Sequence, residues 1–261
     1  MEFCECNISC YNYIIKLVES MQDTIVYNNF SDKHTLSLQL RRNVFKPNLT
    51  TELCIQVAEN ILMGDESLLD LGCGCGAIGL TLAQCLKSNA RIYGSDISKH
   101  AVELTRLNAK LLNLSVDARV GSGFSPWKDM KFDIIINDIS GISEQVAPFT
   151  PWFSDDIPCR TGKDGCEVTN QIIVQAINHM NLGGQLLFPV ISLSNSLAVL
   201  SIARELYQSV EKVKTKYWPL PANMIEVLPL LRSLKAKGYV QFQEQFGMIV
   251  CWTDIYVCRN F

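Results

Sequence analysis

The sequence predicts an α/β protein with a doubly wound, mostly parallel sheet, and three observations carry this prediction. From residue 67 onward, apolar strands alternate with amphipathic helices, the order that builds a parallel sheet through right-handed crossovers. Four glycines lie where one of these strands turns into a helix. After about residue 210, strand patterns dominate, with a single helix between them. We therefore expect a seven-stranded sheet that finishes in an antiparallel hairpin at its C-terminal edge.

Composition supports a folded domain of this kind. The chain has 261 residues, of which 48% are hydrophobic and 19% charged, so it can bury a large core. The formal net charge of −3 does not favour a nucleic-acid partner, which would select a basic surface. No segment approaches the roughly 20 apolar residues of a membrane span, and no signal peptide precedes the first elements. We expect a cytoplasmic protein without a membrane partner.

The 11 cysteines are a high count, but their spacing does not indicate a metal site. Cys4, Cys6 and Cys10 lie close together, yet no second pair of cysteines or histidines has the spacing of zinc ligands. In a reducing compartment they are most simply free thiols. We expect no bound metal.

The N-terminal part precedes the regular alternation. Residues 10–23 carry apolar side chains at helical spacing, and residues 35–45 alternate apolar and polar residues as a half-buried strand does. Pro47 then breaks the chain. A second helix begins after a capping residue, Thr50 or Thr51.

The remaining elements follow from hydrophobic periodicity and from the glycines and polar clusters that bound them. The expected helices cover residues 50–63, 77–86, 99–113, 167–180, 195–210 and 224–237. The expected strands cover residues 67–71, 90–96, 116–121, 134–136, 185–191 and 211–218. Two further strands, at 239–245 and 248–258, flank Phe246-Gly247 and predict the antiparallel hairpin.

The glycine-rich turn "LLDLGCGCGAIGL" carries the strongest chemical signal. Glycines let the backbone approach a ligand, and the helix that follows offers its positive N-terminal end. Gly74-x-Gly76-x-x-Gly79 alone would match a dinucleotide site. The preceding Asp70 and the additional Gly72 favour S-adenosylmethionine instead, because its ammonium group attracts a carboxylate and it carries no pyrophosphate.

These motifs resemble those of class I S-adenosylmethionine-dependent methyltransferases. "LLDLGCGCGAIGLTLA" is similar to their first motif and "IYGSDISKHAVELTRLNAKLLNL" to their second. The chain resembles in particular the release-factor glutamine methyltransferases, over about residues 44–191, including "VFKPNLTTEL", "RTGKDGCEVTNQII" and "NLGGQLLF". The resemblance implies a Rossmann-like fold, S-adenosylmethionine as cofactor and enzymatic methyl transfer.

The resemblance also implies which residues hold the cofactor. Asp70 and the glycine loop would surround the methionine part, Asp96 would bind the ribose hydroxyls and Ile97 would pack on the adenine. The family usually has Gly-Asp after its third strand; this chain has Gly121-Ser122, so Ser122 or nearby backbone would face the adenine amine. The expected cofactor-binding residues are Asp70, Gly72, Cys73, Gly74, Gly76, Asp96, Ile97, Ser122 and Asn137.

The strand "KFDIIINDISGI" ends in a departure from the family. The relatives carry Asn-Pro-Pro-Tyr there, and this chain carries Asn137-Asp138-Ile139-Ser140. Asn137 could still accept a hydrogen bond, but without the prolines and the ring a flat amide would be poorly held. Asp138 adds a carboxylate that could orient an amine or take a proton. We expect Asn137 and Asp138 to be the catalytic residues; the alternative is that Asp138 is a turn residue.

The segment that follows is expected to cover the site. Residues 147–158, "APFTPWFSDDIP", are rich in proline and aromatics, which favours an ordered loop. Trp152 and Phe153 are the expected substrate-contacting residues, because either could replace the missing tyrosine ring. The alternative is that both serve only in packing.

From these features we expect methyl transfer to a nitrogen or oxygen nucleophile of a small-molecule acceptor. One alternative is a protein methyltransferase acting on a glutamine amide of a release factor or ribosomal protein. Another is a non-catalytic module that binds the cofactor or a partner. We assign residues 1–46 to an N-terminal extension of helix and strand that caps the acceptor site, and residues 47–261 to the methyltransferase domain.

Overall fold

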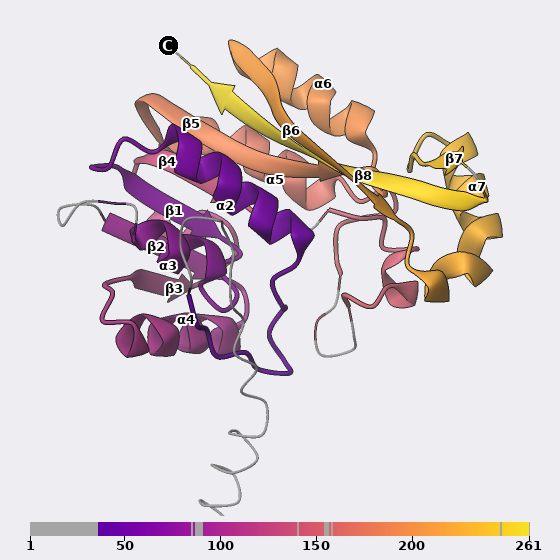
Figure 1. The fold of residues 1–261 in the computed structure, drawn as a ribbon. Helices are drawn as coiled ribbons and strands as arrows, with labels where there is room; N and C mark the ends of the chain where they lie inside the picture. Colours follow the sequence, from indigo (N-terminus) through magenta and orange to yellow (C-terminus); the bar gives the residue numbers. More distant parts are fainter. Residues whose placement is uncertain are drawn as a thin grey trace, which may run out of the picture.

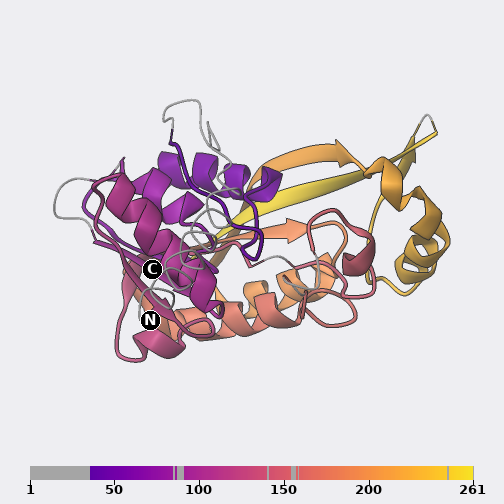
Figure 2. The ribbon, with the colours of Figure 1, turned by 90° about the horizontal axis from the view of Figure 1, so that it is seen from below.

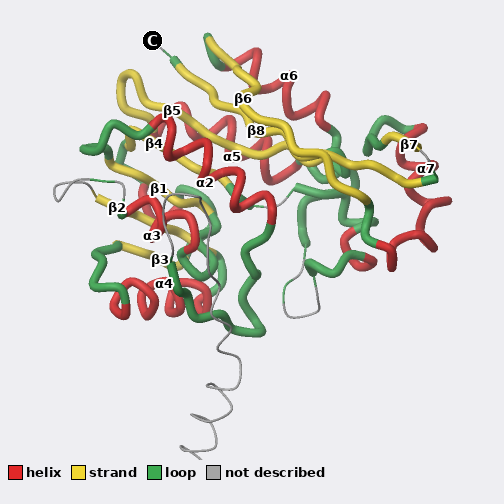
Figure 3. The backbone as a smooth tube through the Cα atoms, in the orientation of Figure 1, coloured by secondary structure: helices red, strands yellow, loops and turns green. Residues whose placement is uncertain are grey.

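The computed structural model describes residues 36–84, 86, 91–139, 141–153, 157, 159–245 and 247–260. The helix expected at residues 10–23 lies outside this part of the chain. Figures 1 and 3 show a twisted sheet with helices packed on both faces.

The sheet of the described residues has eight strands, in the order β3-β2-β1-β4-β5-β8-β6, with β7 pairing only to β8. Strands β1 to β5 pair in parallel, and β8 is antiparallel to both of its long neighbours. This confirms the predicted doubly wound architecture. The strands are β1 (Ser67–Leu71), β2 (Arg91–Asp96), β3 (Asp117–Val120), β4 (Phe132–Asn137), β5 (Met180–Ile191), β6 (Ser209–Pro219), β7 (Gln243–Gln245) and β8 (Met248–Arg259).

Helices cover the sheet in two layers, visible edge-on in Figure 2. The first layer packs through Ile55, Leu80 and Leu104, and the second through Ile173 and Val199, each against its own face of the sheet. The first layer contains α2 (Leu49–Ile61), α3 (Ala77–Ala83) and α4 (Lys99–Leu111), and the second contains α5 (Glu167–Ala176) and α6 (Ser196–Leu206).

The prediction of a strand at residues 35–45 is wrong for the described part of this segment, residues 36–45, in which only Leu38 forms an isolated β-bridge. The alternation that suggested it is nevertheless real, because Leu36, Leu38 and Leu40 are buried in the core of the first layer. The side chain of Asn108 in α4 bonds both the N–H and the C=O of Gln39. A side-chain amide thus replaces the neighbouring strand that the pattern implied.

The C-terminal hairpin forms but does not lie at the edge of the sheet. β7 pairs with β8 through three residues, whereas β8 is inserted between β5 and β6, which leaves β6 as the edge strand. Thr253 to Cys258 in β8 are all buried, as a central strand requires. The strand expected at residues 239–245 is limited to Gln243–Gln245, and the sheet of the described residues has eight strands where seven were expected.

Several helix ends also differ from the expected ones. α5 ends at Ala176, and a 3-10 turn (Ile177–His179) leads into a strand that begins before the Gly183-Gly184 pair. α6 ends at Leu206 because Tyr207 is extended, and its hydroxyl donates to the carbonyl of Ile173. The last expected helix begins as a 3-10 turn (Ala222–Val227) before α7 (Leu228–Ala236).

The far ends of β6 and β8 leave the two layers and form a lobe with α7 and β7 (Figures 1 and 2). This lobe has a core of its own, in which Met224, Leu231 and Phe242 pack against Ile142 and Leu193. No helix in the described part of the chain has the length and apolar character needed to cross a membrane.

Candidate active site

A cavity of about 550 Å³ opens at the carboxyl ends of the central parallel strands. Asp70, Asp96 and Asp138 line it, and they come from the ends of β1, β2 and β4. This edge of a doubly wound sheet is the usual place for a ligand. Three carboxylates in one cavity favour a ligand with positive charge.

The glycine loop forms one wall of the cavity. Gly72, Gly74 and Gly76 all have positive φ angles, of 76°, 54° and 86°, which side chains other than glycine adopt at a cost. A Cβ on Gly72 would lie 2.7 Å from Cγ1 of Ile139, and one on Gly76 would lie 2.7 Å from Cδ1 of Leu80. Gly74 lines the cavity, and a Cβ there would meet only backbone oxygens, at 3.8 Å or more. A side chain at position 74 would therefore fill space that is open to a ligand.

Asp70 is a carboxylate only 2% exposed. Its Oδ2 accepts a hydrogen bond from the N–H of Gly79 at 3.0 Å, and its Oδ1 has no partner among the described residues. Burial raises the pKa of Asp70 to about 7, although the hydrogen bond from Gly79 lowers it. The nearby carboxylates of Asp138 and Asp96 also raise this pKa. An unpaired buried oxygen of this kind suits an ammonium group.

Asp96 and the turn after β3 bound the other end of the cavity. The Asp96 carboxylate accepts hydrogen bonds from the N–H groups of Gly74 and Ser98, at 3.1 and 2.8 Å. Burial raises the pKa of this carboxyl above its ordinary value. Ile97 is 74% exposed and lines the cavity with Ser122. These positions suit a ribose and a flat ring above it.

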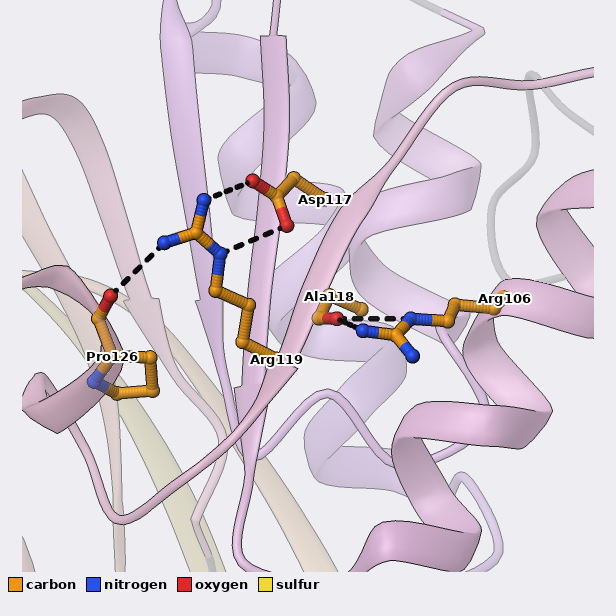
Figure 4. A network of polar contacts seen from close by, with 5 residues as sticks. All are labelled: Arg106, Asp117, Ala118, Arg119 and Pro126. Carbon is orange, nitrogen blue, oxygen red and sulfur yellow. Dashed lines mark hydrogen bonds and ion pairs between the residues drawn. The ribbon is translucent and has the colours of Figure 1, made fainter.

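A polar network holds the backbone that carries Ser122 (Figure 4). Arg119 pairs with Asp117, at 2.6 Å, and donates to the carbonyl of Pro126 at 3.2 Å. It thereby joins β3 to the 3-10 turn Ser125–Trp127. The turn is fixed on both sides of Ser122 because the N–H of Gly121 also bonds the carbonyl of Asp96, at 2.9 Å.

Asn137 ends β4 and is fully buried. Its Oδ1 accepts a hydrogen bond from the N–H of Ile139 at 3.3 Å, and its Nδ2 has no partner among the described residues. Asn137 is not among the residues that line the cavity, whereas Asp138 and Ile139 are. The structure thus places the two expected catalytic residues differently.

Asp138 faces the cavity and is held by α2. Its Oδ2 accepts a hydrogen bond from Oγ1 of Thr51 at 2.7 Å. The same hydroxyl accepts from the N–H of Asn48, at 3.3 Å, as part of the capping box of α2. Burial raises the pKa of Asp138 to about 7, although the bond from Thr51 lowers it.

Of the two aromatic residues expected to contact substrate, one lines the cavity and the other does not. Phe153 lines the cavity, and its ring centroid lies 5.5 Å from that of Phe45. Trp152 packs edge-on against Trp218, at 5.6 Å, and is not among the residues lining the cavity. Only Phe153 is placed where it could cover a ligand.

Sequence reasoning missed several residues of the site, of which three have side chains suited to contact a ligand or to hold Asp138. Phe45 and Arg160 line the cavity, and Thr51 bonds Asp138. The capping pattern identified Thr51 as a helix-starting residue, but no local signal connects it to a strand end 87 positions away. Among the described residues, no group of histidine, cysteine and carboxylate side chains could hold a metal, and the seven described cysteines are free thiols.

Comparison with known proteins agrees with this geometry. Residues 42–138 match the family of the methyltransferase small domain. The chain is 29% identical over 164 residues to a release factor glutamine methyltransferase of Dictyoglomus turgidum, covering 58% of each protein. It is 34% identical over 155 residues to one of Buchnera aphidicola, covering 56% of this chain and 53% of that one. The match thus spans about half the length of these curated relatives.

Solved structures show the same fold at low sequence identity. A ribosomal protein L11 methylase from Lactobacillus delbrueckii subsp. bulgaricus aligns with a TM-score of 0.58 and 15% identity, covering 91% of this chain and all of that one. A chain in the structure of the E. cuniculi Mtq2-Trm112 complex aligns with a TM-score of 0.52 and 15% identity, covering 84% of this chain and 99% of that one. These likenesses establish the architecture.

Proposed function

This chain carries a class I S-adenosylmethionine-dependent methyltransferase domain, and from that premise we propose that it is an enzyme that methylates a glutamine side-chain amide of a protein. The observation that carries the proposal is the cavity in which the glycine loop, Asp70 and Asp96 meet. A release factor is the first candidate acceptor, because the relatives named above are release factor glutamine methyltransferases.

The residues present fit S-adenosylmethionine. The unpaired Oδ1 of Asp70 suits the ammonium group, and the open space at Gly74 admits the methionine part. Asp96 keeps lone pairs for the ribose hydroxyls, and Ile97 and Ser122 flank the position for the adenine. When bound, S-adenosylmethionine supplies a methyl group already activated on a sulfonium. The protein's task is to align the acceptor and exclude water, for which Phe153 and Phe45 are suitably placed.

The small-molecule acceptor expected from the sequence becomes the second candidate. The relatives support a protein acceptor better, since both are named for a glutamine of a release factor. Asp138 brings a carboxylate to the cavity, which keeps an amine or hydroxyl acceptor open. Residues 36–46 contribute Asn43, Val44 and Phe45 to the cavity. The assignment of residues 1–46 to a capping extension and the cytoplasmic location both stay predictions.

The proposal is tested with isotopically labelled S-adenosylmethionine. Calorimetry measures donor binding, and mass spectrometry follows one methyl group onto a recombinant release factor and onto a panel of amines, acids and phenols. We expect donor binding and transfer to a glutamine. Gly74→Val should abolish donor binding, because its side chain fills the open space. Gly238→Val is the matched control, since Gly238 also has a positive φ but has nothing within 4 Å of its Cβ position.

The outcomes test the enzyme assignment and the identity of the acceptor separately. Failure to bind the donor would overturn the enzyme assignment itself. Donor binding with transfer to a small amine or phenol, and none to the release factor, would move the acceptor to the second candidate.

A further inference from the structure

The oxygen of Asn137 is already engaged by the chain's own backbone. The N–H of Ile139 donates to Asn137 Oδ1, and the amide group is fully buried, away from the residues that line the cavity. Asn137 is therefore not presented to a ligand in the cavity, whereas the next residue, Asp138, brings a carboxylate to it.

Asp138 is the polar group that faces the cavity in place of Asn137. Its Oδ2 is bonded to Thr51, and its Oδ1 has no hydrogen-bond partner among the described residues. The carboxylate thus has one oxygen fixed by the protein and one available to a ligand.

The orientation of Thr51 is determined by the cap of α2. Its Oγ1 accepts from the backbone N–H of Asn48, so its single hydroxyl proton is directed to Asp138. Asn48 Oδ1 in turn accepts from the N–H groups of Thr50 and Thr51. Asp138 is therefore held by a chain of bonds that begins in the backbone of a helix N-terminus.

We propose that Asp138, and not Asn137, receives the hydrogen of the acceptor nitrogen, and that Thr51 is the residue that positions it. The inference rests on the proposed function and specifies how its acceptor is recognised. Asp138 is then a catalytic residue and Thr51 a positioning residue.

The proton balance requires such a group. As the bond between the acceptor nitrogen and the methyl carbon forms, the carbon–sulfur bond breaks and its electron pair stays on sulfur. The nitrogen becomes positively charged and strongly acidic, and one of its two hydrogens passes to the Asp138 carboxylate. The products are the N-methyl amide, the neutral thioether and a protonated Asp138, which returns its proton to solvent.

The surroundings of Asp138 set the pH at which it can act. Asp70 from β1 and the Cys54 thiol from α2 are electrostatically coupled to it, and Cys159 and Arg160 line the same cavity. Burial raises the pKa of Asp138 to about 7 despite the bond from Thr51. Because only the ionised form accepts a proton, kcat should rise with pH through about 7.

Five proteins test the inference: wild type, Asp138→Asn, Thr51→Val, Thr51→Ser and Thr50→Val. Asp138→Asn keeps a hydrogen-bond acceptor but removes the base, so kcat should fall by about 10² to 10⁴-fold and lose its pH inflection. Thr51→Val should lower kcat about tenfold and move the inflection to higher pH, and Thr51→Ser should restore both. Thr50→Val is the matched control, because Thr50 is buried in the same helical turn without a side-chain bond to Asp138.

Two measurements do not depend on turnover. With ¹³C-labelled aspartate, the Asp138 carboxyl resonance, identified by its loss in Asp138→Asn, should titrate at higher pH in Thr51→Val than in Thr50→Val. Propionamide, which has the amide of a glutamine side chain, should shift this resonance in protein loaded with S-adenosylhomocysteine.

Failure of the inference differs from failure of the proposed function. If wild type methylates the release factor and Asp138→Asn keeps its rate and pH profile, Asp138 does not receive the hydrogen. If Thr51→Val leaves the Asp138 titration unchanged, or if propionamide leaves the resonance unmoved, the inference is overturned whatever the release-factor result. Wild type that binds the donor but does not methylate the release factor counts against the proposed acceptor alone.

Discussion

Asp70 shows how one buried residue prepares the site for a cationic ligand. A carboxylate without water or a counter-ion is costly to ionise, so the protein holds this one partly protonated, with its pKa raised to about 7 chiefly by burial. Its Oδ1 has no partner among the described residues, so a bound ammonium would restore what burial removes. Asp70 is therefore destabilised in the free protein, and the ammonium group of the proposed donor would stabilise it.

This arrangement predicts that donor binding releases protons. Burial raises the pKa of Asp70 to about 7, and the ammonium favours the ionised form, so binding near neutral pH should release protons and should weaken as pH falls below 7. Calorimetry in two buffers of different ionisation enthalpy measures the release. Asp70→Asn keeps the acceptor for the Gly79 N–H but has no proton to lose.

The Asn variant therefore serves as the control. Equal proton release from wild type and from Asp70→Asn would show that Asp70 is not the group linked to donor binding.

At the scale of elements, the connection from β4 to α5 is shaped by close backbone contacts. A Cβ on Gly141 would lie 2.7 Å from the carbonyl oxygen of Gly165, and one on Gly165 would lie 2.4 Å from the carbonyl carbon of Ile142. The Thr161 hydroxyl also donates to the Ile142 carbonyl. The two ends of this long loop thus cross immediately after Asp138, which fixes the direction in which the chain leaves the active site.

We predict that Gly165→Ala destabilises the protein more than Gly183→Ala. Both glycines have φ near +75°, so both variants bear the cost of a left-handed alanine, about 1–2 kcal/mol. Only Gly165 has backbone atoms within 3 Å of the added Cβ, which should add about 1–3 kcal/mol. Urea unfolding of the two variants measures the difference in the free energy of unfolding.

The comparison is direct because nothing lies within 4 Å of the Cβ position at Gly183. Equal losses of stability in the two variants would mean that the loop crossing can open without cost.

At the scale of the whole molecule, the residues proposed to bind the donor and the core of the C-terminal lobe come from different parts of the chain. The described residues that line the cavity end at Gln175, whereas the lobe is built from the far ends of β6 and β8 with α7. The lobe core meets the cavity at Phe153 and Cys159, whereas the glycine loop, Asp70 and Asp96 lie outside that core. Stability and donor binding should therefore respond independently to changes in the lobe.

We predict that Leu231→Ala lowers the free energy of unfolding by about 2–5 kcal/mol but leaves donor affinity unchanged. Leu231 is fully buried in the lobe. Leu69, next to Asp70 in β1, is fully buried in the core between the sheet and the second helix layer. Leu69→Ala should lower both stability and donor affinity. Urea unfolding and donor calorimetry on the two variants, at a temperature where both are folded, measure the contrast.

Weaker donor binding in Leu231→Ala, to the same degree as in Leu69→Ala, would show that the lobe and the cavity are coupled.

The sequence by itself determined the features that depend on neighbouring residues. Hydrophobic periodicity predicted the parallel strands and their helices, because each element must bury one face or one stripe. The glycine loop and the two aspartates at strand ends predicted a shared site, and the structure brings them together around one cavity. These signals are local, so they could be recognised before any long-range contact was known.

Only the tertiary structure decided which distant groups meet. β8 lies between β5 and β6, and the backbone of Gln39 bonds the side chain of Asn108 where a neighbouring strand was expected. Trp152 packs on Trp218 and does not reach the cavity. In the fold, Thr51 also donates a hydrogen bond to Asp138, 87 positions away, and the N–H of Ile139 donates one to the Asn137 oxygen. Hydrogen bonds form wherever packing brings donor and acceptor together, and sequence spacing does not specify that meeting.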